Sequence, residues 1–150
     1  YLLATGFENV TVLDISELAI QRAINRLGKR AEKVKWIVAD AASFQPKETY
    51  DFWHDRATFH FLTADADVRS YLNAAYTSLN PEGILVLGTF SEHGPTKCSG
   101  IEIKQYSKES MSDKVKDRFE LIDCLVVDHK TPSNLVQNFL FCSFRKRKNA

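Results

Sequence analysis

Residues 10–14 read Val-Thr-Val-Leu-Asp, a short apolar run that ends in an acid. The same pattern returns as Lys-Trp-Ile-Val-Ala-Asp over residues 35–40 and as Tyr-Asp-Phe-Trp-His-Asp over residues 50–55. Short apolar runs of this kind are typical of strands buried in a parallel sheet. Each predicted strand therefore carries an aspartate at its carboxyl end, at positions 14, 40 and 55.

The segments around these runs have the spacing of amphipathic helices. One helix is predicted over residues 16–28, and a second over residues 66–79 with Thr63 or Asp65 as its cap. A strongly apolar strand is predicted over residues 84–90. Alternating strands and helices favour a parallel sheet with right-handed crossovers.

The pattern changes after residue 90. Ser107 can cap a short helix, and two long strand-like runs follow over residues 119–128 and 135–145. The residues that join these runs leave no room for a crossover helix, so the two strands should pair antiparallel. The predicted fold class is α/β: a Rossmann-like, doubly wound, mostly parallel sheet with a C-terminal antiparallel hairpin.

Composition excludes several classes of protein. The chain has 150 residues, of which 44% are hydrophobic, and a formal net charge of +1. This charge gives no field that would select nucleic acid or an anionic membrane, and no apolar stretch is long enough for a membrane span. The three cysteines, Cys98, Cys124 and Cys142, lack zinc-site spacing, so we expect reduced thiols, no bound metal and a cytoplasmic location.

The strand-end acids suggest a ligand site. In open parallel sheets, ligands bind outside the carboxyl ends of the strands. Asp14 can accept hydrogen bonds from both hydroxyls of a ribose, and Asp40 can accept from an exocyclic amine. Each could equally cap the turn that follows it. Ile15 could supply an apolar wall for an adenine ring, although such a residue more often belongs to the core.

A parallel sheet finished by an antiparallel hairpin resembles the class I S-adenosylmethionine-dependent methyltransferases, from the second strand of that fold to its seventh. The stretch Leu-Asn-Pro-Glu-Gly over residues 79–83 also resembles the LxPGG turn of that family, with Glu82 where glycine is usual. The resemblance implies S-adenosylmethionine as the cofactor. It places Asp14 at the ribose hydroxyls and Asp40, followed by Ala41, at the adenine amine.

The resemblance also assigns the loop after the fourth strand of that fold, residues 55–62 here, to the methyl-transfer centre. Asp55 and Arg56 would border the cofactor, and Asp55 and His60 are candidates for the base that removes a proton from the acceptor. Two readings remain open for Arg56, which could pair with Asp55 or hold a substrate carboxylate. His60 could instead be a structural histidine beside Phe59 and Phe61.

The first strand of the family fold and its GxGxG-type turn are not found in residues 1–150. We therefore expect a single methyltransferase-like domain that lacks its N-terminal strand and first helix, as part of a longer protein. The expected reaction is methyl transfer to a small molecule, with nucleic acid and membrane as unfavoured partners and the oligomeric state open. The alternatives are an NAD(P)-dependent oxidoreductase-like domain and a catalytically inactive interaction module. The acid after the third strand of that fold and the terminal hairpin argue against the oxidoreductase.

Overall fold

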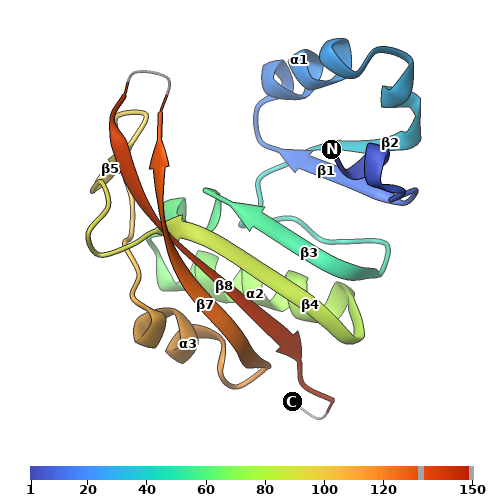
Figure 1. Cartoon of the computed structure of the whole chain (residues 1–150). Coiled ribbons are helices and arrows are strands. Elements are labelled where there is room, and N and C mark those ends of the chain that lie inside the picture. Colours follow the sequence, from blue (N-terminus) through green and yellow to red (C-terminus); the bar gives the residue numbers. More distant parts are fainter. Residues whose placement is uncertain (132–133, 149–150) are drawn as a thin grey trace. The chain divides into compact units, whose positions relative to one another are not determined.

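The computed structural model describes residues 1–131 and 134–148 (Figure 1). The chain forms two compact units, Tyr1–Phe44 and Gln45–Ala150. The first unit contains, in chain order, η1 (Leu2–Thr5), β1 (Val10–Asp14), α1 (Glu17–Leu27), η2 (Gly28–Lys33) and β2 (Val34–Val38).

In the first unit, β1 and β2 are parallel, and their register runs from Val10 opposite Val34 to Asp14 opposite Val38. The helix that connects them begins where the sequence predicts, because the Ser16 hydroxyl accepts a hydrogen bond from the backbone N–H of Ala19 at 3.2 Å. This β-α-β segment therefore brings the ends of β1 and β2 to one edge of the unit.

The second unit contains a four-stranded sheet in the order β3-β4-β8-β7. β3 and β4 are parallel, whereas β8 is antiparallel to both β4 and β7, so the predicted C-terminal hairpin is confirmed. A small antiparallel pair, β5 with β6, was not predicted. The elements of this unit are β3 (Tyr50–Arg56), η3 (Phe59–Phe61), α2 (Asp65–Ser78), β4 (Leu79–Phe90), β5 (Lys97–Cys98), β6 (Ile101–Glu102), α3 (Lys108–Val115), β7 (Phe119–Lys130) and β8 (Val136–Lys146).

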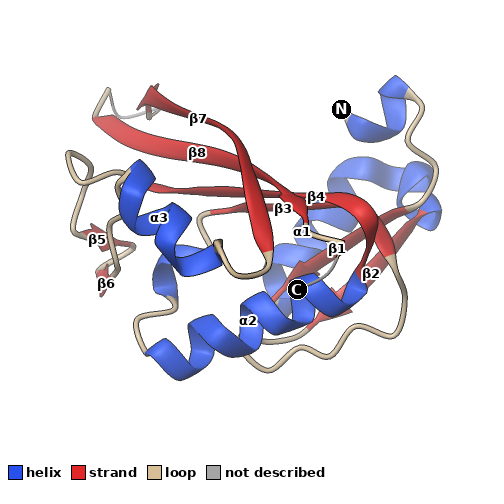
Figure 2. Cartoon of the chain, turned by 90° about the horizontal axis from the view of Figure 1, so that it is seen from below, coloured by secondary structure: helices blue, strands red, loops and turns tan. Residues whose placement is uncertain are grey.

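Helices α2 and α3 cover one face of this sheet (Figure 2). The core lies between them and the sheet, and its large buried side chains come from both helices and from β4, β7 and β8: Tyr71, Leu72, Leu85, Leu87, Met111, Phe119, Leu140 and Phe144. Side chains alternate between the two faces of a strand, so Trp53 and Asp55 of β3 face α2, whereas Arg56 faces away from it.

Two predicted boundaries differ from the structure. Helix α2 starts at Asp65 with Ala64 as its N-cap residue, and no side chain caps it, so neither Thr63 nor Asp65 has the predicted capping role. Residues 80–83, predicted as a turn, belong to β4 because the strand already begins at Leu79. The positive φ of Glu82, 65°, retains some turn character there.

The prediction of three reduced cysteines is wrong for two of them. Cys124 on β7 and Cys142 on β8 lie directly opposite each other and form a disulfide, whereas Cys98 is free. The two cysteines are 18 residues apart in sequence, but the hairpin makes them neighbours. The expectation of a cytoplasmic location thus loses the support that it drew from reduced thiols.

β7 is an edge strand of the sheet, and its outer edge has no strand partner among residues 1–131 and 134–148. Several of its apolar side chains are exposed: Ile122, Leu125, Val126 and Val127. A register shift between Leu121 and Asp123 interrupts the pairing with β8. Edge strands expose backbone hydrogen-bonding groups, and irregularities of this kind are common on them.

Candidate functional site

Asp14 and Asp40 lie at the same edge of the first unit. Asp14 is the last residue of β1, and its carbonyl oxygen accepts a hydrogen bond from the N–H of Ala39 at 3.1 Å, which joins the ends of the two strands. Oδ1 of Asp14 accepts from the N–H of Ser16 at 2.8 Å, and Oδ1 of Asp40 accepts from the N–H of Ala42 at 2.9 Å. Each acid therefore holds the turn after its strand.

Only one oxygen of each carboxylate is used in this way. Within the described part of the chain, Oδ2 of Asp14 and Oδ2 of Asp40 accept no hydrogen bond. Asp14 is half-buried and Asp40 is exposed, so both free oxygens belong to side chains that solvent reaches. The turn-capping role and a ligand role are thus compatible in the same side chain.

Apolar residues accompany these acids. Ile15 directly follows Asp14 and is 70% exposed, and Val38, opposite Asp14 in the register, is 52% exposed. Ala41 follows Asp40 and is half-buried. This edge of the unit therefore combines hydrogen-bond acceptors with exposed apolar surface, which is the composition of a site for a planar, partly polar ligand.

In the second unit, Asp55 lies near the carboxyl end of β3 and is buried, with 5% exposure. Its Oδ1 accepts hydrogen bonds from the N–H groups of Thr58 at 2.9 Å and Phe59 at 3.3 Å, and its Oδ2 accepts from the Tyr71 hydroxyl at 2.6 Å. The Trp53 indole N–H in turn donates to the Tyr71 oxygen at 2.9 Å. These contacts fix the loop after β3 to helix α2.

Burial raises the pKa of Asp55, and the hydrogen bonds from Tyr71 and from the N–H groups of Thr58 and Phe59 offset part of that rise. The pKa of Tyr71 lies well above its usual value because the phenol is buried and because the Asp55 charge is close. Tyr71 therefore keeps its proton at neutral pH and donates its hydrogen bond to Asp55. Because Asp55 is buried and accepts hydrogen bonds from the loop backbone and from Tyr71, its environment is that of a residue that holds a loop in one conformation.

The loop after β3 is also held by its backbone. Ala57 has a φ of 67°, in the left-handed region that non-glycine residues seldom adopt, and its N–H donates to the carbonyl of Gly88 on β4 at 2.8 Å. Strained backbone of this kind persists where the surrounding contacts determine it, and it is common at functional sites. The hydrogen bonds that the N–H groups of Thr58 and Phe59 donate to Asp55 supply such contacts one and two residues later.

His60 is fully buried in η3, between the rings of Phe61 and Phe90. Its Nδ1 accepts a hydrogen bond from the N–H of Phe90 at 3.4 Å, so Nε2 carries the proton of the neutral ring. Nε2 has no hydrogen-bond partner among the described residues. Burial lowers the pKa of His60 to about 4, and the ring is therefore neutral at pH 7.

Arg56, the last residue of β3, is exposed, and its guanidinium carbon lies 5.6 Å from the centroid of the Phe139 ring on β8. It does not pair with Asp55, whose oxygens are taken by Tyr71 and the loop backbone. One of the two readings left open by the sequence, an Arg56–Asp55 ion pair, is therefore not found.

The structure groups the predicted residues in two places. Asp14, Ile15, Asp40 and Ala41 lie together in the first unit, and Asp55, Arg56 and His60 lie on the loop after β3 in the second. Sequence reasoning missed Tyr71 and Trp53, which complete the Asp55 network. Both were expected only as strand and helix residues, and no sequence signal links them to Asp55.

Two further features concern metal ions and membranes. Across the described residues, no three His, Cys, Asp or Glu side chains gather in a way that could hold a metal ion. No helix of residues 1–131 and 134–148 combines the length and apolar character that a bilayer crossing requires.

Comparison with known sequences reveals a family likeness. The model of the family described as "Methyltransferase domain" matches residues 1–83. Nodulation protein S of Rhizobium fredii is 29% identical over 87 residues, which is 58% of this chain and 49% of that protein. Malonyl-[acyl-carrier protein] O-methyltransferase 2 of Ilyobacter polytropus is 29% identical over 84 residues, 56% of this chain and 31% of that enzyme. The aligned part thus spans at most about half the length of these relatives.

Solved structures share the fold. The N-methyltransferase NodS of Bradyrhizobium japonicum, in complex with S-adenosyl-L-homocysteine, has a TM-score of 0.75 and 19% identity, covering 97% of this chain and 70% of NodS. The 1,6-didemethyltoxoflavin-N1-methyltransferase of Burkholderia thailandensis has a TM-score of 0.76 and 20% identity, covering 99% of this chain and 65% of that enzyme. These likenesses confirm the predicted Rossmann-like methyltransferase fold.

Proposed function

The chain belongs to the methyltransferase domain family, and from that premise we propose that it serves the transfer of a methyl group from S-adenosylmethionine to a small-molecule nucleophile. When bound, the cofactor supplies an electrophilic methyl group on a sulfonium. The small-molecule acceptor is suggested by structures such as that of the 1,6-didemethyltoxoflavin-N1-methyltransferase, which contains bound 1,6-didemethyltoxoflavin and S-adenosylhomocysteine.

One observation carries the cofactor assignment. Asp14 and Asp40 each use one carboxylate oxygen to hold the turn after their strand, and the second oxygen has no partner in the described part of the chain. A ribose diol needs an acceptor of that kind, and so does an exocyclic amine. We assign the ribose hydroxyls to Asp14 and the adenine amine to Asp40, with Ile15 and Ala41 as apolar neighbours of the base.

The loop after β3 has a different role in this proposal. A base must reach a proton on the acceptor, yet Asp55 and His60 are buried and each already accepts a hydrogen bond from the backbone. We therefore assign Asp55 and His60 a positioning role: they hold the loop from Arg56 to Phe61 in one conformation. In-line methyl transfer depends chiefly on such positioning of the acceptor.

The test is a calorimetric titration of the full chain with S-adenosylhomocysteine, S-adenosylmethionine and NADH. We expect the first two ligands to bind and NADH not to bind. Asp14→Ala should weaken S-adenosylhomocysteine binding roughly ten- to hundredfold, because a charge-assisted hydrogen bond contributes about 1.5–3 kcal/mol. Glu32→Ala, which removes an exposed acid of the same unit, is the matched control and should leave the affinity unchanged.

NADH binding without S-adenosylhomocysteine binding would replace the proposal with the oxidoreductase reading. Binding of neither ligand would favour an interaction module. If Asp14→Ala and Glu32→Ala bind S-adenosylhomocysteine equally well, Asp14 does not hold the ribose.

A further inference from the structure

The Arg56 guanidinium has a charge that no group in the described part of the chain balances. Among residues 1–131 and 134–148, the structure gives it neither an ion pair nor a hydrogen bond, and its guanidinium carbon lies 5.6 Å from the centroid of the Phe139 ring. Asp55, the neighbouring acid, lies on the other face of the sheet and is bonded to Tyr71. When a guanidinium packs against an aromatic ring, the flat face of the guanidinium meets the ring. The N–H groups around the edge of the guanidinium then remain available to donate hydrogen bonds.

Arg118 provides a comparison, because its guanidinium has both a ring contact and a hydrogen-bond partner. Its guanidinium carbon lies 5.4 Å from the centroid of the Tyr76 ring, an arrangement close to that of Arg56. Its Nη1 also donates a hydrogen bond to Oδ1 of Asn73 at 3.0 Å. Arg56 has the stacking contact without such a polar partner, and this difference suggests that its donors serve a ligand.

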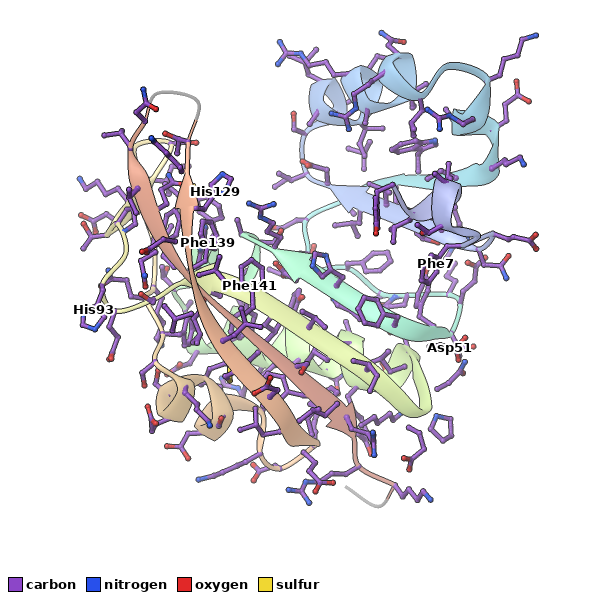
Figure 3. The ribbon with its side chains drawn as sticks, viewed as in Figure 1. Phe7, Asp51, His93, His129, Phe139 and Phe141 are labelled. Atoms are coloured by element: carbon purple, nitrogen blue, oxygen red, sulfur yellow. A yellow bond between two sulfur atoms is a disulfide. The ribbon has the colours of Figure 1, made fainter. Side chains whose placement is uncertain are left out.

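Aromatic rings lie beside Arg56: Phe139 is buried, with 4% exposure, and Phe141 is half-buried. Phe139 and Phe141 of β8 are stacked, with ring centroids 5.7 Å apart and an interplanar angle of 21°. The His129 ring lies 6.2 Å from that of Phe139 (Figure 3). Phe141 sits directly over Gly88, where a Cβ would come within 2.4 Å of the ring. The lack of a side chain at Gly88 thus lets the Phe141 ring lie against the sheet.

The register brings the cation and the rings together. Arg56 pairs with Gly88 of β4, and Gly88 pairs with Phe141 of β8, so the three residues form one row across the sheet. Because side chains alternate along a strand, and Trp53 and Asp55 face α2, this row lies on the opposite face of the sheet. It is also at the carboxyl end of β3, where ligands bind in sheets of this kind.

We propose that Arg56 binds an oxyanion of the methyl acceptor, a carboxylate or a phosphate, while the half-buried Phe141 ring contacts the apolar or aromatic body of that molecule. The planar fork of a guanidinium can donate two parallel hydrogen bonds to either anion. The Asp55 network and the Ala57 turn hold Arg56 in place before the ligand arrives, which lowers the entropic cost of binding. This inference rests on the proposed methyltransferase function, because it assigns Arg56 to the acceptor.

The experiment is a titration of the full chain, saturated with S-adenosylhomocysteine, followed by NMR. The probes are benzoate, phenyl phosphate and the neutral analogue benzamide. We expect an anionic probe to shift the signals of Phe139 and Phe141 and to bind roughly tenfold more tightly, or better, than benzamide. The tighter of benzoate and phenyl phosphate identifies the anion as carboxylate or phosphate.

Two variants make the result specific. Arg56→Gln should reduce the affinity for the anionic probe to that for benzamide, and because the side chain is exposed, its thermal unfolding should match that of the parent. Arg118→Gln, the matched stacked arginine, should bind the probe as the parent does. The proposal is overturned if Arg56→Gln binds the anion unchanged, or if benzamide binds as tightly as benzoate and phenyl phosphate.

Binding of S-adenosylhomocysteine tests the proposed function, and binding of the anionic probes tests the role of Arg56. A chain that binds S-adenosylhomocysteine but neither anionic probe keeps its proposed function and loses the Arg56 assignment. A chain that binds the anion through Arg56 but not S-adenosylhomocysteine retains an anion site, and it then loses both the methyltransferase proposal and the acceptor role given to Arg56.

Discussion

Burial of the His60 ring should make the stability of the second unit depend on pH. The pKa of His60 falls from 6.5 to about 4 on folding, because the ring is removed from water. Between these two values the unfolded chain binds more protons than the folded one, so stability rises with pH in that window. The stabilisation is fully present above about pH 6.5 and is lost progressively as the pH falls toward 4.

The size of the effect follows from the two pKa values. Between about pH 7.5 and about pH 5, His60 alone should lower the free energy of unfolding by about 2 kcal/mol. His60→Gln removes this contribution, so the difference in stability between the parent and His60→Gln should shrink by that amount at the lower pH. Other groups that titrate in the same window cancel in this comparison.

Urea denaturation followed by tryptophan fluorescence measures the effect. The chain has two tryptophans, and in a Trp36→Phe background the signal reports only on Trp53 in the second unit. His93→Gln, which changes an exposed histidine, provides the baseline. If the difference between the parent and His60→Gln is the same at both pH values, the ring is not buried in its neutral form and the positioning role of His60 fails.

Two more predictions follow from packing and from the cysteines. Gly88→Ala should lower the free energy of unfolding by about 1–3 kcal/mol in urea denaturation, since its Cβ would collide with the Phe141 ring; an unchanged midpoint would show that the ring can move away. Reducing the disulfide with dithiothreitol should lower the same quantity by up to about 3 kcal/mol, the value expected for a loop of this length, and the double variant Cys124→Ser/Cys142→Ser should no longer respond to the reductant.

The order and type of the main elements could be predicted from local patterns. Ser16 and Gly28 define α1 because a hydroxyl cap and a C-terminal glycine act on their own neighbours in sequence. The terminal hairpin followed from the short connection between its strands. These features depend on interactions within a few residues, and such interactions are visible in the sequence.

The disulfide could have been found with one more step. In an antiparallel hairpin, each step back along the first strand matches a step forward along the second. From the pair Lys130 and Val136, that count reaches Cys124 opposite Cys142. The prediction failed because the cysteines were judged by spacing in the chain and not by the register of the hairpin.

The candidate site was predictable only in part. The positions of Asp14 and Asp40 followed from the strand ends, but the bond from Tyr71 to Asp55 joins residues 16 positions apart on different elements. Whether Asp55 faces the helices or solvent depends on which face of β3 is covered, and that is decided by tertiary packing. Local sequence therefore located Asp55 and left its burial undetermined.

The exposed edge of β7 has a consequence for handling the protein. A second molecule could add a strand there, and its contact would be reinforced by apolar side chains such as Leu125 and Val126. Asp123 and Asp128 place negative charges on the same strand, and in two aligned copies these charges repel each other. Salt that screens these charges would weaken this protection, so concentrated stocks should stay clear longer at low than at high ionic strength.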